Sequence, residues 1–139
     1  MPARDLYHPV VRNALIKDGW TITADPYLIE YEDTKVYADL EAEMPIAAER
    51  AGRKIVVEIK SFVSVSPIHA FEEALGQYIL YFGYLELTAP DHELYLAVSD
   101  EAYSRVLERP ALKVIVEKNH LAVIVVSLAR EEIVRWIDW

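Results

Sequence analysis

The chain has 139 residues, no cysteine, and 23 acidic against 14 basic side chains, which gives a formal net charge of −9. Without cysteine, disulfide bonds, thiolate nucleophiles and cysteine-based zinc sites are excluded. The negative charge argues against a free-standing nucleic-acid binder, whose affinity comes largely from lysine and arginine on phosphates. The length and the hydrophobic content of 53% predict one packed domain over residues 1–139.

Targeting and membrane signals are not visible in the sequence. No run of about twenty apolar residues is present, so no membrane-spanning helix is expected. The first residues, MPARDLYHPVV, lack the apolar stretch of a secretory signal. We therefore expect a cytoplasmic protein that does not associate with membranes.

The N-terminal half predicts one helix followed by strands. Apolar spacing predicts a helix over 4–18 that ends at Gly19. Short extended segments follow at 20–24 and 27–31, split at Asp25-Pro26. Alternation predicts a strand over 35–41 and another over 44–49, which turns at 50–53 into an antiparallel strand over 54–60.

The C-terminal half alternates helices and strands. Ser66 and Pro67 predict the start of a long helix that runs to Leu87. We then expect a strand over 93–98, helices over 100–108 and 110–118, a buried strand over 121–126 and an edge strand over 133–137. For 110–118 a strand stays an alternative, because LKVIV has strand propensity. The order predicts a three-layer α/β fold with a central mixed β-sheet flanked by helices. The long helix is expected to bury Ile68, Phe71, Leu75, Tyr78, Phe82 and Leu85.

Two charged residues interrupt the apolar strand over 54–60. Glu58 and Lys60 are two positions apart, so both side chains should lie on one face of the strand. If the preceding strand pairs with it, Asp39 converges on the same face. Two carboxylates, the carbonyl of Ile59 and water suit Mg²⁺ or Mn²⁺, which lowers the pKa of a bound water. The alternative is a surface strand with a cross-strand salt bridge.

Polar residues on the two long helices could complete this site. His69, Glu73, Gln77 and Tyr81 follow i, i+4 spacing and form one stripe. Gln77 and Tyr81 could contact a phosphate or orient the metal ligands, unless the stripe simply faces water. In the first helix, His8 could serve as a general base or outer metal ligand if it lies near the site. Otherwise His8 is a structural residue; Glu43 is a further acid that could lie close by.

These residues resemble the PD-(D/E)xK phosphodiesterase superfamily. Asp39 corresponds to the aspartate of that motif, and Glu58-Ile59-Lys60 corresponds to (D/E)-x-K. The segment from Gln77 to Tyr81 is similar to the Q-x-x-x-Y of the RecB-type exonuclease branch. His8 departs from the pattern, because many resolvase-type members carry glutamate there; Ala38 replaces the motif's proline. The resemblance implies a restriction-endonuclease-like fold and a magnesium-dependent nuclease site.

Longer segments look like the XisH family, which is named for the fdxN-element excision controlling factor. They cover most of the chain: PARDLYHPVVRNALIKDGWTIT, VYADLEAE, VVEIKSF, EEALGQYILY and VRWI. The resemblance implies an accessory protein of site-specific DNA excision that acts on DNA with a separate recombinase. It also implies a small partner protein of the XisI type.

Three functions remain open from the sequence. The first is an accessory factor of programmed DNA excision that keeps a Mg²⁺ site, and the second is an active Mg²⁺-dependent endodeoxyribonuclease. The third is a non-catalytic interaction module whose acidic surface docks a basic partner. The complete set of Asp39, Glu58 and Lys60 favours retained chemistry, whereas the net charge of −9 favours dependence on a partner. Assembly into a homo-oligomer is also left open.

Overall fold

The structure is a computed structural model that describes residues 3–32, 34–35, 45–63 and 65–139. Its helices are α1 (Ala3–Lys17), α2 (Pro67–Thr88), α3 (Asp100–Ala102), the π-helical segment η1 (Tyr103–Leu107) and α4 (Pro110–Lys118). The strands are β1 (Thr21–Ala24), β2 (Glu30–Tyr31), β3 (Thr34–Lys35), β4 (Ile46–Arg50), β5 (Arg53–Ile59), β6 (His92–Ser99), β7 (Val123–Ser127) and β8 (Glu132–Ile137).

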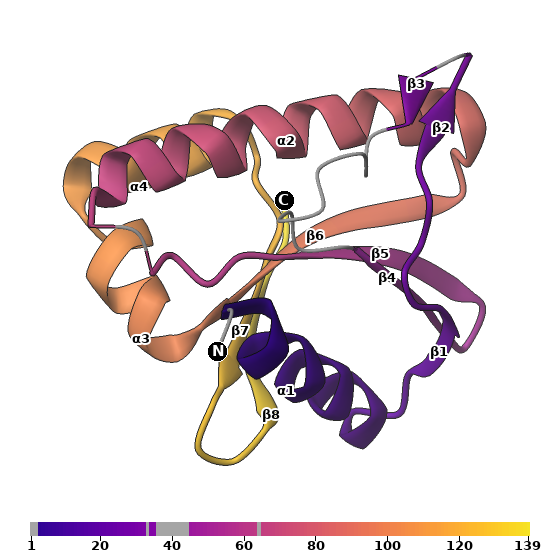
Figure 1. Cartoon of the computed structure of the whole chain (residues 1–139), viewed down its shortest axis with the longest axis horizontal. Helices are drawn as coiled ribbons and strands as arrows, with labels where there is room; N and C mark the ends of the chain where they lie inside the picture. Colours follow the sequence, from indigo (N-terminus) through magenta and orange to yellow (C-terminus); the bar gives the residue numbers. More distant parts are fainter. Residues whose placement is uncertain (1–2, 33, 36–44, 64) are drawn as a thin grey trace.

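A mixed six-stranded sheet forms the middle layer, in the order β1–β4–β5–β6–β7–β8. β5, β6 and β7 run parallel to one another, while β1, β4 and β8 add antiparallel pairings at the sides. Helix α1 lies on one face of the sheet, and α2 and α4 lie on the other (Figure 1). The predicted three-layer α/β fold with a central mixed sheet is confirmed.

Most of the predicted elements are present. The segment 110–118 is a helix, and the segment 133–137 belongs to the edge strand β8. The strand 121–126 is buried on both faces but lies second from the edge of the sheet. The strand expected over 35–41 falls almost wholly on residues 36–44, which lie outside the described residues.

Local chemistry explains where α1 ends and where α2 begins. Helix α1 stops at Gly19, whose φ of +94° is a left-handed conformation that glycine adopts without steric cost. At the start of α2, the hydroxyl oxygen of Ser66 accepts a hydrogen bond from the backbone N–H of His69 at 3.3 Å. Pro67 occupies the first turn, where its missing N–H needs no partner.

The buried face of α2 differs from the predicted one. Ile68 and Phe82 are 53% and 47% exposed, whereas Ala74 and Tyr81 are buried. The helix is apolar around most of its circumference, so periodicity fits two overlapping stripes. The buried stripe is Phe71, Ala74, Tyr78, Tyr81 and Leu85.

Two hydrophobic clusters sandwich the sheet, one on each face. On β5, Val56 belongs to the cluster under α2, while Ile55, Val57 and Ile59 belong to the cluster under α1. This alternation confirms the two faces predicted for Ile55, Val56, Val57 and Ile59. Among the described residues, no helix is long and apolar enough to cross a lipid bilayer.

Candidate functional site

Glu58 occupies a buried position near the end of β5. Its side chain is fully buried, and it follows Val56 on the face that packs against α2. Lys60 comes directly after the strand, where its backbone N–H donates to the carbonyl oxygen of Ala97 on β6 at 3.0 Å. The main-chain contact to β6 thus holds the Glu-x-Lys segment at one end of the parallel strands, with Lys60 half-buried.

The charge of Glu58 contributes to the raised pKa values of two tyrosines of α2, Tyr78 and Tyr81. Burial, and secondly the Glu58 carboxylate, raise the pKa of Tyr81 to about 12. Burial is also the main cause that raises the pKa of Tyr78, and the charge of Glu58 contributes. The Tyr78 hydroxyl donates to the carbonyl of Leu94 at 3.3 Å and accepts from the N–H of Ala122 at 3.2 Å, which ties it to the sheet.

The polar stripe predicted on α2 divides into two parts. His69 and Glu73 are exposed and pair with each other at 3.0 Å, as expected for a face in water. Tyr81 is 2% exposed and lies on the side of Glu58, and Gln77, one turn earlier, is half-buried. Tyr81 therefore lies in the interior near the Glu58 carboxylate, and Gln77 lies partly buried one turn before it.

Some of the predicted metal ligands can be placed. The Glu58 carboxylate and the Ile59 carbonyl are oxygen donors, the type that Mg²⁺ prefers, and the ion keeps several waters. The described pairing of β4 with β5 ends at Ile46 opposite Val57, so Glu58 and Ile59 lie beyond it. Asp39 and Glu43 lie outside the residues that the structure describes. Among the described residues, no group of three side chains that could hold a metal ion is present. The donors present fit Mg²⁺ in kind, with Asp39 as the expected second carboxylate.

His8 lies on the helix that covers the other face of the sheet. Its Nε2 is 2.7 Å from Oδ1 of Asp25, and Arg12 pairs with the second carboxylate oxygen. This pairing links α1 to the end of β1. The structure thus places His8 with Asp25, and its role as a general base stays a prediction.

Arg105 is a residue near the site that the sequence did not single out. Its Nη2 donates to the carbonyl oxygen of Phe62 at 2.8 Å, two residues after Lys60. Phe62 is buried and has φ of +55°, a conformation that costs free energy in a residue other than glycine. Arg105 therefore helps to hold the chain where it leaves the Glu-x-Lys segment. Arg105 belongs to the π-helical segment η1, and sequence periodicity does not reveal such a segment.

The burial of Tyr81 near the charge of Glu58 predicts a pH dependence of stability. With a native pKa of about 12 against 10.0 for the free side chain, native Tyr81 keeps a proton that the unfolded chain releases between these values. The free energy of unfolding should therefore fall as pH rises through this window, by up to about 1.4 kcal/mol per unit more than in Tyr81→Phe. Urea unfolding at pH 9, 10 and 11 measures the difference. Tyr31→Phe, at an exposed position, is the control, and equal pH dependence of wild type and Tyr81→Phe would contradict the assignment.

Comparison with known proteins identifies the family. The XisH protein family model matches residues 1–134. The crystal structure of an XisH family protein from Nostoc punctiforme is similar, with 39% identity and a TM-score of 0.87 over 96% of this chain and 100% of that one. The crystal structure of an fdxN element excision controlling factor protein from Anabaena variabilis has 41% identity and a TM-score of 0.87, over 96% and 99% of the two chains. No curated protein matches. The chain belongs to the XisH family.

Proposed function

We propose that this protein is an accessory factor controlling programmed site-specific DNA excision, built on a PD-(D/E)xK nuclease-like fold. The observation that carries the proposal is its similarity, over nearly the whole chain, to an fdxN element excision controlling factor protein. With a TM-score of 0.87, the two chains share their fold. A role in excision then explains why a nuclease-like motif occurs in so acidic a protein.

The proposal includes a Mg²⁺ or Mn²⁺ site formed by Asp39, Glu58 and the carbonyl of Ile59. Glu58 supports it as a carboxylate held at a fixed, buried position near Tyr81, because carboxylate oxygens are ligands that Mg²⁺ prefers. A bound metal would polarise a phosphate oxygen and lower the pKa of its water. In this proposal Lys60 supplies an ammonium group next to the phosphate, and Gln77 of α2 contacts the phosphate or orients the metal ligands.

Contact with DNA is proposed to depend on partners. A chain of net charge −9 gains little affinity from phosphates unless basic surface is added. An XisI-type small protein and the recombinase of the excision reaction are the partners that we propose for this role. In that arrangement the partners bring the DNA, and this chain contributes the charged site at the end of β5.

The excision role predicts an effect in a reconstituted reaction. A reporter plasmid carries an excisable element between its two recombination sites, and cells express the recombinase with or without this chain and its small partner. We expect quantitative PCR across the new junction to detect excision only when the chain is present. Glu58→Gln should reduce excision to the level without the chain, whereas Glu72→Gln, the same charge change at an exposed position of α2, should not. Equal excision with and without the chain would contradict the proposal.

The metal site predicts a specific loss of affinity. Asp39→Asn should weaken Mg²⁺ binding by about 10–100-fold, because one of two carboxylate ligands is neutralised. Isothermal titration calorimetry measures the dissociation constant. Lys60→Ala should leave the affinity intact or improve it, since an ammonium group repels the metal. An unchanged constant in Asp39→Asn would place the metal elsewhere.

A second candidate function is a Mg²⁺-dependent DNA endonuclease, which the position of Lys60 two residues after the buried Glu58 favours. This candidate predicts nicking of supercoiled plasmid in Mg²⁺ or Mn²⁺. Lys60→Ala should abolish nicking while it keeps folding and metal binding, because the ammonium stabilises charge that develops in the transition state. Asp39→Ala is the metal-deficient control. A nicking rate in Lys60→Ala equal to that of wild type would rule out a catalytic role for Lys60.

A further inference from the structure

A cavity of about 430 Å³ lies away from the candidate site, beside the first residues of β6. Residues from the end of α2, the start of β6 and the last residues of the chain line it. Glu58 is paired in register with Leu96, toward the other end of the same strand. Glu58, Lys60 and Tyr81 do not line the cavity, whereas Tyr78, which is near Glu58, does.

Aromatic side chains in fixed positions form much of the wall. Tyr78 is buried at the base and stacks on Phe82, with ring centroids 6.3 Å apart. Trp139 also lines the cavity: its indole N–H donates to the carbonyl of Leu121 at 2.7 Å, and its ring stacks on His120 at 5.3 Å. Phe82 and Trp139 remain 47% and 55% exposed, so their faces are available to a ligand.

The fixed charges of the lining are all negative. Glu86, Glu93 and Asp138 line the cavity, and no lysine or arginine is among the described residues that do. Glu86 is exposed near the end of α2, and Asp138 accepts a hydrogen bond from the hydroxyl of Tyr95. Carboxylates beside aromatic faces attract a cation and repel phosphate groups. The ligand chemistry that fits is therefore cationic, and nucleic acid does not fit.

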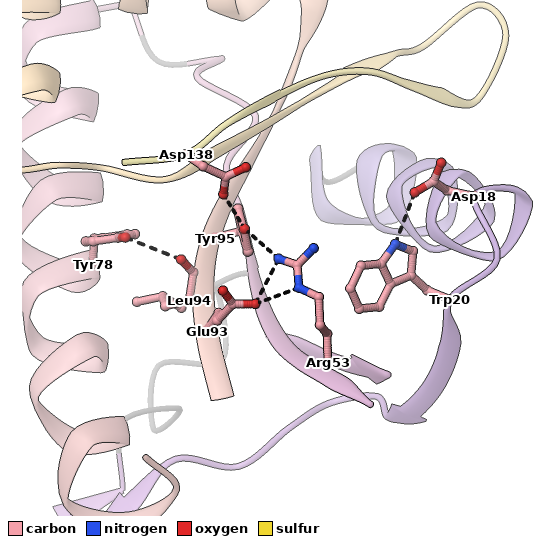
Figure 2. A network of polar contacts seen from close by, with 8 residues as sticks. All are labelled: Asp18, Trp20, Arg53, Tyr78, Glu93, Leu94, Tyr95 and Asp138. Atoms are coloured by element: carbon pink, nitrogen blue, oxygen red, sulfur yellow. Dashed lines mark hydrogen bonds and ion pairs between the residues drawn. The ribbon is translucent and has the colours of Figure 1, made fainter. Parts of the chain in front are cut away.

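The chain already holds a guanidinium with the same groups next to the cavity. Arg53 donates to Glu93 through two nitrogens, at 3.1 and 2.8 Å, and to the hydroxyl of Tyr95 at 3.1 Å (Figure 2). Its guanidinium lies 5.7 Å from the ring centroid of Trp20. Glu93 and Tyr95 thus accept one guanidinium from the side of β5, while they also line the cavity.

We infer that this cavity binds a lysine or arginine side chain from a basic segment of a partner protein. Its volume lies within the usual range of ligand pockets and exceeds that of one side chain, so it also admits the flanking backbone. The charge of −9 draws such a segment toward the protein, and Glu86 with the faces of Phe82 and Trp139 contacts the cationic group.

A labelled peptide tests the inference. The probe is a fluorescein-labelled hexapeptide of alternating glycine and arginine, titrated with the full chain and followed by fluorescence anisotropy. The matched peptide carries citrulline, a neutral isostere, in place of arginine. We expect Glu86→Gln and Phe82→Ala each to weaken binding about three- to fivefold, because each removes one contact to the cation. Both positions are exposed, so the variants should fold normally.

Glu72→Gln is the control, since it makes the same charge change on α2 outside the cavity. Weakening by less than about twofold is expected there, as for a remote surface charge. In NMR spectra, the indole N–H of Trp139 should show one of the largest shifts on addition of the arginine peptide. Absence of binding, equal binding of the citrulline peptide, or equal weakening by Glu72→Gln and Glu86→Gln would overturn the inference.

Discussion

The parallel pairing of β5 with β6 is the constraint on which the rest of the structure depends. The pair runs in register from Lys54 opposite His92 to Ile59 opposite Ala97, in the middle of the sheet. Helices therefore cover both faces, and each face of β5 contributes to a separate hydrophobic cluster. Any polar side chain in the second half of β5 is necessarily removed from water, and Glu58 is the one that the sequence places there.

On the face of the sheet where Glu58 is buried, α2 packs with Tyr78 and Tyr81. With Tyr78 bonded to main-chain groups of β6 and to Ala122, the helix is fixed in rotation, and Tyr81 follows one turn later beside Glu58. The tyrosine pKa values rise because burial and the carboxylate both oppose a phenolate. Gln77 lies at the border between this interior and the solvent. Solvent exposure therefore decreases along the stripe from His69 to Tyr81. In a helix with a constant polar face, exposure would stay the same along the stripe.

Much of this could be predicted from sequence, and the failures have physical causes. Strand alternation predicted that Glu58 shares a face of β5 with Val56, because side chains two positions apart lie on the same side of a strand. Periodicity did not fix the rotation of α2, where Ile68 and Phe82 satisfy a helical period as well as Ala74 and Tyr81 do. Tertiary packing decides between such stripes.

Contacts between distant residues were beyond sequence reasoning. Arg105, in the π-helical segment η1, donates to the carbonyl of Phe62, and His8 on α1 pairs with Asp25 after β1. The resemblance to the PD-(D/E)xK motif supplied the roles of Asp39 and Lys60, which no periodicity supplies. Chemistry read from a motif needs the fold to bring its parts together, and here the fold places Glu58, Lys60 and Tyr81 while Asp39 stays a prediction.

The distribution of charge connects the two regions of interest. Both lie along β5 and β6, with the Glu-x-Lys segment toward one end and an acidic, aromatic cavity toward the other. The proposed site at Glu58 would need phosphate nearby, yet the carboxylates of the chain repel it. A basic partner held at the cavity would change that balance without altering the residues at Glu58, because it adds positive surface to the same molecule. The partner would then bind at the cavity and the DNA phosphate at Glu58. The site at Glu58 would therefore act on DNA only in the assembled complex.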